Sequence, residues 1–518
     1  MSKIITADYL KIGNAQDLKG KEKIIYRFLE ILPGLLSWLT LFFLFFFSFK
    51  KPFWVAIFII LFDLYWLIKT VYLSIHLRSA YQKMKETLKV NWLEKLKNDY
   101  PNKWQEITHL IILPMYKEPL EIVEESFLAL TKANYPKEKF IVVLSIEEKN
   151  PKRKEIADYL EKKFENKFFK LLITFHPKNL KGEIAGKGAN ESWAAKEADE
   201  KIIKPLNLTE EKIIVSSFDV DSVIFKDYFA YLTYKFLSTP NNQRASYQPI
   251  PLFLNNIWQA NPVSRVMAFS STFWHTLNQD RPEKKITFSS HSLPFKPLKE
   301  INFWQKNVVS EDSRIFWNFF LYFNGNWRVV PLYYPISMDA NTAPKFWQTL
   351  KNIYKQQRRW AYGVADVSYF LYGFLKNKKI PLKKKFRYGF PTFAGFYSWA
   401  TNALIIFLGG WLPLIFGEEK FRYSLLASHL PFLTRDILTI AMVGIVSSAV
   451  LTIQILPPRP PNYPKRSTIS MVLQWLLVPI TLIIFGSLPA LEAQTRLLLG
   501  KYLDFWFTPK TRQEKRKD

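Results

Sequence analysis

Two aspartates, Asp219 and Asp221, follow the apolar run IIVSSF (213–218) and are separated by one residue. Carboxylates this close repel each other unless a cation lies between them. Mg²⁺ and Mn²⁺ prefer hard oxygen ligands and bridge readily to a diphosphate, so the pair could hold such an ion. The alternative is a turn in which an aspartate caps a helix beginning near Ile224. The position directly after a buried strand favours the metal site.

A further carboxylate, Asp312, lies in SEDSRIF (310–316) at the start of an amphipathic segment. A carboxylate within hydrogen-bond reach of an acceptor hydroxyl can take its proton during attack, which makes Asp312 a candidate general base. The alternative interpretation is a helix N-cap, which requires no chemistry. The motif alone does not decide between the two.

The segment KQQRRWAYG (355–363) places Gln356, Arg359 and Trp360 at helical spacing i, i+3, i+4, so these side chains share one face. An arginine there could pair with a leaving diphosphate, and a tryptophan could stack on a sugar ring. The alternative is a basic amphipathic helix lying on a membrane surface. The two interpretations are compatible.

These motifs need a scaffold, which the pattern of residues 106–335 predicts. Apolar runs typical of strands occur at ITHLIILP, KFIVVLSI, FFKLLITF and KIIVSSF, and helix-like segments such as LEIVEESFLALTKAN separate them. Strands that alternate with helices predict an α/β fold with a mostly parallel sheet covered on both faces. Ligands bind such sheets at the carboxyl ends of the strands, where Asp219 and Asp221 lie.

Apolar stretches at both ends of the chain predict a membrane protein. Residues 31–49 and 53–68 read as a transmembrane hairpin, and Asp63 within it receives no assigned role. Later runs occupy 396–417, 437–456 and 471–493. Residues 1–30 carry six Lys and Arg, which places the N-terminus and the central block in the cytoplasm. The basic C-terminus also prefers the inside, so we expect one of the three late spans to be miscounted.

Composition excludes several other classes. The chain has 518 residues, a net charge of +28 and no cysteine, so disulfides, cysteine–zinc sites and thiol nucleophiles are absent. The positive charge suits anionic lipids or phosphorylated substrates. Nucleic acid is not an expected partner, because the charge is spread over membrane-flanking segments and no recognition-helix or zinc pattern occurs.

The order of IILPMYKEP, GKGANES, FDVDS, SEDSRIF and QQRRW, followed by membrane spans, resembles glycosyltransferase family 2. The similarity is greatest to the membrane-embedded branch typified by cellulose and hyaluronan synthases, and it covers about residues 106–365. It implies a GT-A-like domain that uses a nucleotide-diphosphate sugar, with Mg²⁺ or Mn²⁺ as cofactor. It also implies a glycan or lipid-linked acceptor met at the lipid surface of an inner membrane.

The resemblance implies a role for each matching residue. Asp312 would be the catalytic base, Asp221 the metal ligand, and Asp219 a contact on the nucleotide side that could share the metal. The other implied ligand-binding residues are Pro114, Tyr116, Glu118, Glu147, Lys187, Asn190, Gln356, Arg359 and Trp360. Glu147 and Glu148 stand where the family usually has an aspartate, and TFSSHSLPF (287–295) lacks a Gly-rich acceptor turn. His291 in that loop reads as a polar loop residue rather than a catalytic one.

The resulting expectation is an inverting, multi-pass membrane hexosyltransferase, most naturally in polysaccharide synthesis. One alternative is transfer of a single sugar to a lipid, and another is an inactive transporter or scaffold that retains the fold. The expected organisation is a cytoplasmic N-terminal segment (1–30), a transmembrane hairpin (31–77), a linker (78–105), a glycosyltransferase domain ending in an interfacial helix (106–380), a C-terminal transmembrane region (381–500) and a basic tail (501–518).

Overall fold

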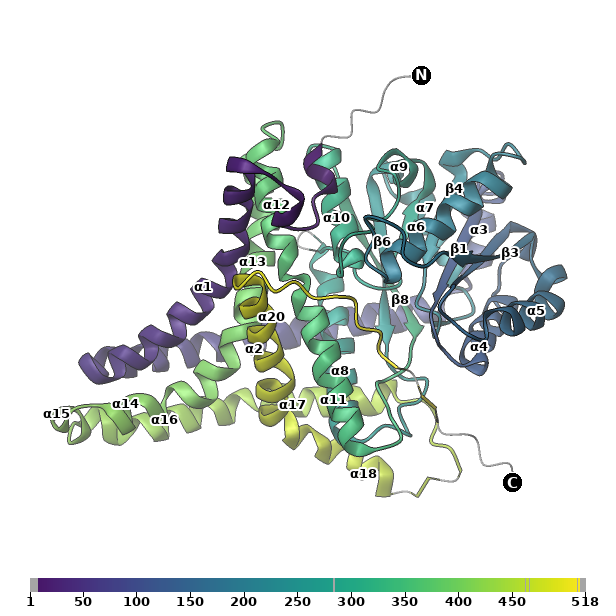
Figure 1. Ribbon diagram of the computed structural model, residues 1–518. Helices are drawn as coiled ribbons and strands as arrows, with labels where there is room; N and C mark the ends of the chain where they lie inside the picture. The colour runs from purple at the N-terminus through teal and green to yellow at the C-terminus, as the bar shows by residue number, and fades with distance from the viewer. Residues whose placement is uncertain (1–7, 283–284, 462, 465, 510, 513–518) are drawn as a thin grey trace.

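The computed structural model describes residues 8–282, 285–461, 463–464, 466–509 and 511–512, and it joins an α/β domain to a group of long apolar helices (Figure 1). One sheet of eight strands forms the centre of the domain, in the order β3-β2-β1-β4-β7-β6-β8-β5. The strands are β1 Thr108–Met115, β2 Phe140–Glu147, β3 Lys170–His176, β4 Ile213–Ser217, β5 Val223–Ile224, β6 Ala245–Leu252, β7 Ser292–Pro294 and β8 Arg328–Ser337.

The sheet is mixed. Strands β3, β2, β1 and β4 are parallel, and each coincides with an apolar run that the sequence predicts to be a strand. Strand β7 is antiparallel to β4 and β6, β8 is parallel to β6, and β5 is antiparallel to β8. The parallel arrangement expected from the sequence therefore applies to the half of the sheet formed by β3, β2, β1 and β4, and the other half is mixed.

Helices cover both faces of the sheet, which explains why the strands are continuous apolar runs rather than alternating ones. Leu110 and Ile112 of β1 face one core, and Ile111 and Leu113 face the other. The helices of the domain are α3 Trp92–Asp99, α4 Leu120–Thr131, α5 Arg153–Phe164, α6 Lys187–Ala198, α7 Tyr228–Ser238, α8 Pro262–Leu277, α9 Phe295–Glu300, α10 Glu311–Tyr322, α11 Phe346–Ala361 and α12 Ala365–Lys376.

Two local alternatives considered for the motifs are wrong. Ser310 is the N-cap of α10, and Asp312 lies in the first turn of that helix. No helix begins near Ile224 in this described part of the chain, because Val223–Ile224 is strand β5 and α7 starts only at Tyr228. Neither aspartate motif is thus explained by a capping role of the kind considered.

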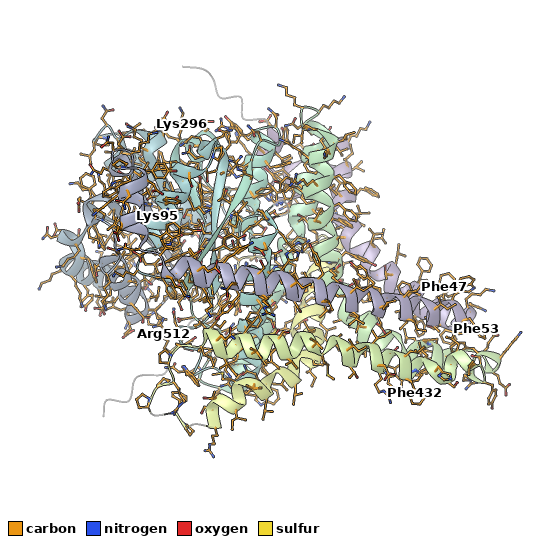
Figure 2. The ribbon with its side chains drawn as sticks, turned by 180° about the vertical axis from the view of Figure 1, so that it is seen from behind. Phe47, Phe53, Lys95, Lys296, Phe432 and Arg512 are labelled. Atoms are coloured by element: carbon orange, nitrogen blue, oxygen red, sulfur yellow. The ribbon has the colours of Figure 1, made fainter. Side chains whose placement is uncertain are left out.

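Five helical stretches are long and apolar enough to cross a membrane, judged by length and composition: Gly20–Lys50, Pro52–Lys89, Leu382–Gly409, Leu425–Ile455 and Arg466–Leu498. They comprise α1 Gly20–Lys50, α2 Pro52–Lys89, α13 Leu382–Leu404, α16 Leu425–Ala441, α17 Val443–Ile455, α18 Arg466–Leu473, α19 Val478–Thr481 and α20 Leu488–Leu498, while α14 Trp411–Phe416 and α15 Glu419–Arg422 lie between the third and fourth stretches. Figure 2 shows Phe47, Phe53 and Phe432 where these helices extend farthest from the domain.

The stretch Arg466–Leu498 differs from the other late helices because it contacts the α/β domain near both of its ends. Arg265 of α8 donates hydrogen bonds to Gln474 Oε1 at 2.7 Å and to Ser470 Oγ at 2.8 Å. At the other end, Arg358 of α11 lies 2.6 Å from Glu492 Oε1. This stretch therefore runs along the domain, and the chain after it returns to the domain surface.

The segment between the apolar hairpin and the sheet is helical. Helix α2 continues to Lys89, and α3 then packs on α7, where the rings of Trp92 and Tyr231 are 4.4 Å apart. The far part of α2 packs against α8 and β8, and Lys83 forms a 2.6 Å ion pair with Asp280. Helix α2 thus connects the apolar helices rigidly to the domain.

Candidate active site

One cavity of about 2270 Å³ collects all twelve of the residues that the sequence marks as a site. Its lining includes Pro114, Tyr116, Glu118, Glu147, Lys187, Asn190, Asp219, Asp221, Asp312, Gln356, Arg359 and Trp360. These residues span almost 250 positions of sequence and come from strand ends, helix starts and a helix face. The fold therefore brings the separate motifs to a common space.

The carboxyl ends of parallel strands supply one wall of this cavity. Glu118 follows β1, and its Oε2 accepts a hydrogen bond from the Tyr116 N–H at 2.7 Å. Glu147 ends β2, and its Oε1 lies 3.1 Å from His176 Nδ1 at the end of β3. Asn190 on α6 donates to the Met115 carbonyl at 3.5 Å. Each side chain is held by a neighbour at the strand-end edge, where α/β sheets bind their ligands.

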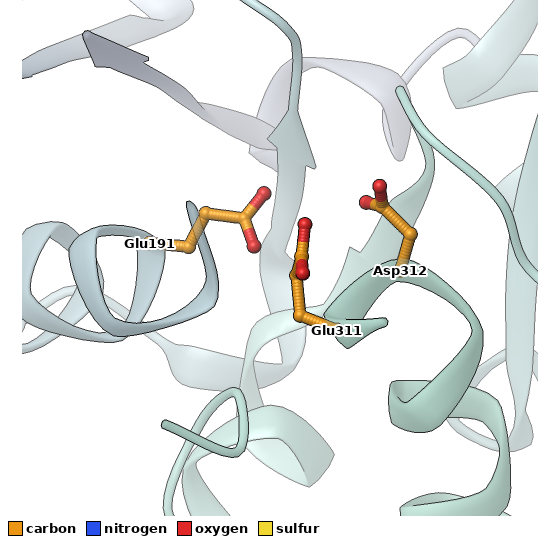
Figure 3. Close-up of side chains that lie close together, drawn as sticks. All are labelled: Glu191, Glu311 and Asp312. Atoms are coloured by element: carbon orange, nitrogen blue, oxygen red, sulfur yellow. The ribbon is translucent and has the colours of Figure 1, made fainter. Parts of the chain in front are cut away.

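Lys187, the first residue of α6, lies among several carboxylates. Its Nζ is 2.8 Å from Asp219 Oδ1, 2.9 Å from Asp312 Oδ1 and 3.5 Å from Glu191 Oε1. Figure 3 shows that Glu191, Glu311 and Asp312 turn their carboxyl groups toward one another. These three could in principle share a metal ion, because their ligand oxygens all lie within 4.8 Å of one another. The Lys187 ammonium already supplies a cation to two of them.

Burial changes the protonation of this cluster. It raises the pKa of Glu191 to about 8, against the opposing effect of Lys187, and raises that of Glu311 well above its ordinary range. The pKa of Lys187 is itself raised, because the carboxylates outweigh the cost of burying its charge. Burial thus favours the neutral form of the two glutamates, and the surrounding carboxylates favour the charged form of Lys187.

Close packing fixes the start of α10 beside the start of α6. A Cβ on Gly188 would lie 2.7 Å from the Cβ of Glu311, so only glycine permits this approach. Arg314 and Asp366 form a buried 2.7 Å ion pair below the first turn of α10, and Arg314 also donates to the Ile12 carbonyl at 3.1 Å. These contacts set the direction in which Asp312 points.

His291 lies in a loop and is fully buried beside Asp312. Its Nδ1 is 2.9 Å from the Phe288 carbonyl and its Nε2 is 3.3 Å from the Trp304 indole nitrogen. A carbonyl accepts and an indole N–H donates, so the ring is neutral with its proton on Nδ1. Burial lowers the pKa of His291, in agreement with this tautomer. His291 Nδ1 lies 3.7 Å from Asp312 Oδ1.

Helix α11 presents the predicted face to the cavity. Gln356 Oε1 accepts from Asn341 at 3.3 Å, and the ring of Trp360 lies 6.3 Å from that of Phe253. The Nε of Arg359 is buried and has no hydrogen-bond partner among the described residues. The opposite side of α11 contacts α20 through Arg358, so α11 is packed between the cavity and the stretch Arg466–Leu498.

Asp221 is completely buried and lies next to Asp339, a residue that the motifs did not reveal. The Asp339 N–H donates to Asp221 Oδ2 at 3.0 Å, and both side chains line the cavity. Two carboxylates of this kind are suitable ligands for Mg²⁺ or Mn²⁺. Asp219 differs from these two aspartates because its carboxylate is paired with the Lys187 ammonium.

Residues 505–509, which follow the last helix, also line the cavity, although the sequence indicated only a basic tail. The Phe505 ring lies 4.9 Å from the Arg359 guanidinium, and the Phe507 ring lies 5.1 Å from that of Tyr116. Arg512 reaches Asp339 at 2.6 Å and also pairs with Glu125. The aromatic sequence FWF (505–507) was the available signal for this contact.

The cavity continues from these polar groups into the apolar helices. Side chains of α2, α8, α13, α16 and α17 line this extension, among them Trp66, Leu73, Trp274, Trp399, Leu438 and Ser448. A single space thus connects the strand ends with the interior of the helical region.

No protein-family model matches the sequence, and no curated protein matches it. Among solved structures, the chain is similar to the mannosyltransferase PcManGT from Pyrobaculum calidifontis in complex with GDP-Man and Mn²⁺, with 14% identity and a TM-score of 0.41 over 75% of this chain and 98% of that chain. It is also similar to S. aureus TarS 1–349 in complex with UDP-GlcNAc, with 14% identity and a TM-score of 0.31 over 68% and 93%. The first of these neighbours is a mannosyltransferase, and both structures contain a bound nucleotide sugar.

Proposed function

We propose that the protein transfers a sugar from a nucleotide-diphosphate donor to an acceptor held at the membrane. The main support is the arrangement of Asp312, Lys187, Asp221 and Arg359 around one cavity at the strand ends. A lysine at a helix start suits a diphosphate, as does Arg359, whose Nε has no hydrogen-bond partner among the described residues. The adjacent carboxylates suit a metal ion bound to that diphosphate.

In this proposal Asp312 acts as the base. It takes the proton of an acceptor hydroxyl while that oxygen attacks the anomeric carbon, and the bond to the diphosphate breaks on the opposite face. Direct displacement of this kind inverts the anomeric centre. Lys187 and Arg359 stabilise the negative charge that develops on the leaving diphosphate. A bound Mg²⁺ or Mn²⁺ would be held by Asp221 and would neutralise part of the same charge.

Lys187 connects Asp219, on the proposed nucleotide side, with Asp312, the proposed base. Its ammonium is shared between Asp219 and Asp312 at 2.8 and 2.9 Å. A donor diphosphate would compete with Asp312 for this cation, and the carboxylate would then be free to accept a proton. We therefore propose that donor binding prepares the base.

The arrangement of helices suggests how the protein crosses the membrane. Both the domain and the segment 499–512 must lie on one side, because Arg512 contacts Asp339. An even number of late spans must then separate them, and Arg466–Leu498 contacts the domain along its length. We propose four crossings, with Arg466–Leu498 at the interface and the catalytic domain in the cytoplasm, which resolves the conflict between span count and tail charge.

The function is tested with purified protein and a panel of activated sugars, by measuring release of free nucleotide diphosphate in the presence of Mg²⁺ or Mn²⁺. Turnover with one donor and its loss in Asp312→Asn would support the proposal. Absence of both binding and turnover across the panel would favour an inactive transporter or scaffold. The length of the product then separates polysaccharide synthesis, which gives a ladder, from single transfer, which gives one glycolipid.

A further inference from the structure

Lys285 is a buried lysine that lies outside the group of charged residues around Lys187 and Asp312. Lys285 precedes the loop that carries His291, lines the same cavity and is 4% exposed. No described residue forms an ion pair with its ammonium, and burial lowers its pKa well below the ordinary value. A charge in this position costs several kcal/mol of desolvation unless an anion compensates it. The nucleotide site does not use it.

Arg281 is a second cationic residue, and it lines the same cavity as Lys285. Its guanidinium lies 5.8 Å from the Tyr72 ring of α2, and its Nε is buried without a hydrogen-bond partner among the described residues. The neighbouring carboxylate Asp280 is already engaged by Lys83 at 2.6 Å and by the Tyr333 hydroxyl at 2.9 Å. The Nε–H of Arg281 is therefore available to donate a hydrogen bond to a bound anion.

The depth of these cations corresponds to the surface of a bilayer. Tyr72 lies just beyond the end of the apolar run 53–68, where Lys69 is the first basic residue. The apolar branch of the cavity begins there, between Leu73 and Leu77 of α2 and Phe273 and Leu277 of α8. A phosphate near Arg281 would thus lie at headgroup depth, with an apolar branch of the cavity continuing beside it.

The distance to the reaction centre fits an acceptor of limited size. Lys285 and His291 are six positions apart in the sequence, so their Cα atoms are at most about 22 Å apart. His291 lies 3.7 Å from Asp312. A general base is useful for a hydroxyl but not for an ionised phosphate, so the phosphate at Lys285 would anchor the acceptor rather than attack.

From these observations we propose that Lys285 and Arg281 bind the phosphate of a lipid-linked acceptor whose apolar chain occupies the cavity between α2, α8 and α16. This inference rests on the proposed glycosyl transfer and names its acceptor class. A neutral growing glycan would not require a buried lysine without a described ion pair beside an arginine whose Nε has no described hydrogen-bond partner. The aliphatic lining suits a hydrocarbon chain better than a sugar polymer.

The test uses the full chain in detergent and three probes: farnesyl phosphate, farnesol and inorganic phosphate. We expect farnesyl phosphate to bind at least about 10-fold more tightly than either of the others, because only it satisfies both the cations and the apolar branch. Lys285→Met should lower farnesyl phosphate affinity by about 10-fold or more, and Lys285→Arg should retain it. Lys296→Met, at an exposed lysine on the domain surface (Figure 2), is the matched control.

Thermal unfolding distinguishes a binding role from a structural one. Removal of an uncompensated buried charge should leave the melting temperature of the empty protein unchanged or raise it. Equal farnesyl phosphate affinity in Lys285→Met and the native protein would overturn the inference. Inorganic phosphate binding as tightly as farnesyl phosphate would also overturn it, in favour of a simple anion site. The nucleotide-sugar panel tests the proposed function separately, since these measurements contain no donor.

Discussion

The Arg512 guanidinium lies 2.6 Å from Asp339 Oδ1, and the Asp339 backbone N–H in turn donates to Asp221 Oδ2 at 3.0 Å. Two contacts therefore connect the segment 499–512 to the aspartate pair that follows β4. Because Phe505 and Phe507 of the same segment pack on Arg359 and Tyr116, the segment lies between helix α11 and the end of β1 along the cavity wall.

Arg512→Ala should loosen this segment, because it removes the ion pairs with Asp339 and Glu125. We expect chymotrypsin to cleave at the aromatic residues 505–507 several-fold faster in this variant, since local opening controls access. Arg78→Ala, at an exposed position of α2, serves as the control. Equal cleavage rates in Arg512→Ala and the control would show that the ion pairs do not hold the segment.

Asp312→Asn should abolish transfer and spare donor binding. The amide keeps the size of the side chain but cannot accept a proton, so the rate should fall by about 10²- to 10⁴-fold. Turnover and donor affinity are measured separately, by release of nucleotide diphosphate and by calorimetry. Asp158→Asn on the exposed surface of α5 is the control. Normal turnover in Asp312→Asn would refute the role of this residue as the base.

Asp221→Asn should remove the response of the protein to divalent cations. The loss in activity should be roughly 100-fold or more, because a metal contributes several kcal/mol of charge stabilisation. Calorimetric titration of nucleotide with and without Mn²⁺ measures the effect without requiring turnover. A Mn²⁺ response in Asp221→Asn equal to that of the native protein would contradict the metal assignment.

His176 makes stability depend on pH. Burial alone would lower its pKa, but the carboxylates of Glu147 and Glu183, each 3.1 Å away, raise it above the ordinary value. The folded protein then binds the proton more tightly than the unfolded chain does, so the stabilisation is present below about pH 6.5 and is lost as pH rises through the folded pKa. The melting temperature of His176→Asn should therefore fall less than that of the native protein between about pH 6 and pH 9. Parallel curves for the two proteins would exclude this titration.

Much of the domain was accessible from sequence because its strands are buried on both faces. Strands β1, β2 and β4 are buried almost along their whole length, and residues that follow or end them carry most of the motifs. The spacing in QQRRW likewise predicted that Gln356, Arg359 and Trp360 share a helical face. Local pattern sufficed here because each motif depends on its own secondary-structure element.

The remaining features depend on contacts between distant segments, which local pattern does not encode. Asp339 and Arg512 are 173 positions apart, and neither belongs to a recognisable motif. The position of His291 depends on its contacts with Trp304 and Asp312, so the loop sequence alone could not reveal that it is buried beside the candidate base. The antiparallel strand β7 contains only three residues, too few for a periodic signal.

Helix α11 has one face in the reaction cavity and the other against α20 through Tyr354 and Arg358. If Arg466–Leu498 lies in the bilayer surface, any tilt or immersion of that stretch must displace Arg359 and Trp360, which line the cavity. The thickness and lateral tension of the bilayer would then affect the rate of turnover. Turnover in micelles and in lipid discs of different acyl length would differ even with identical substrates.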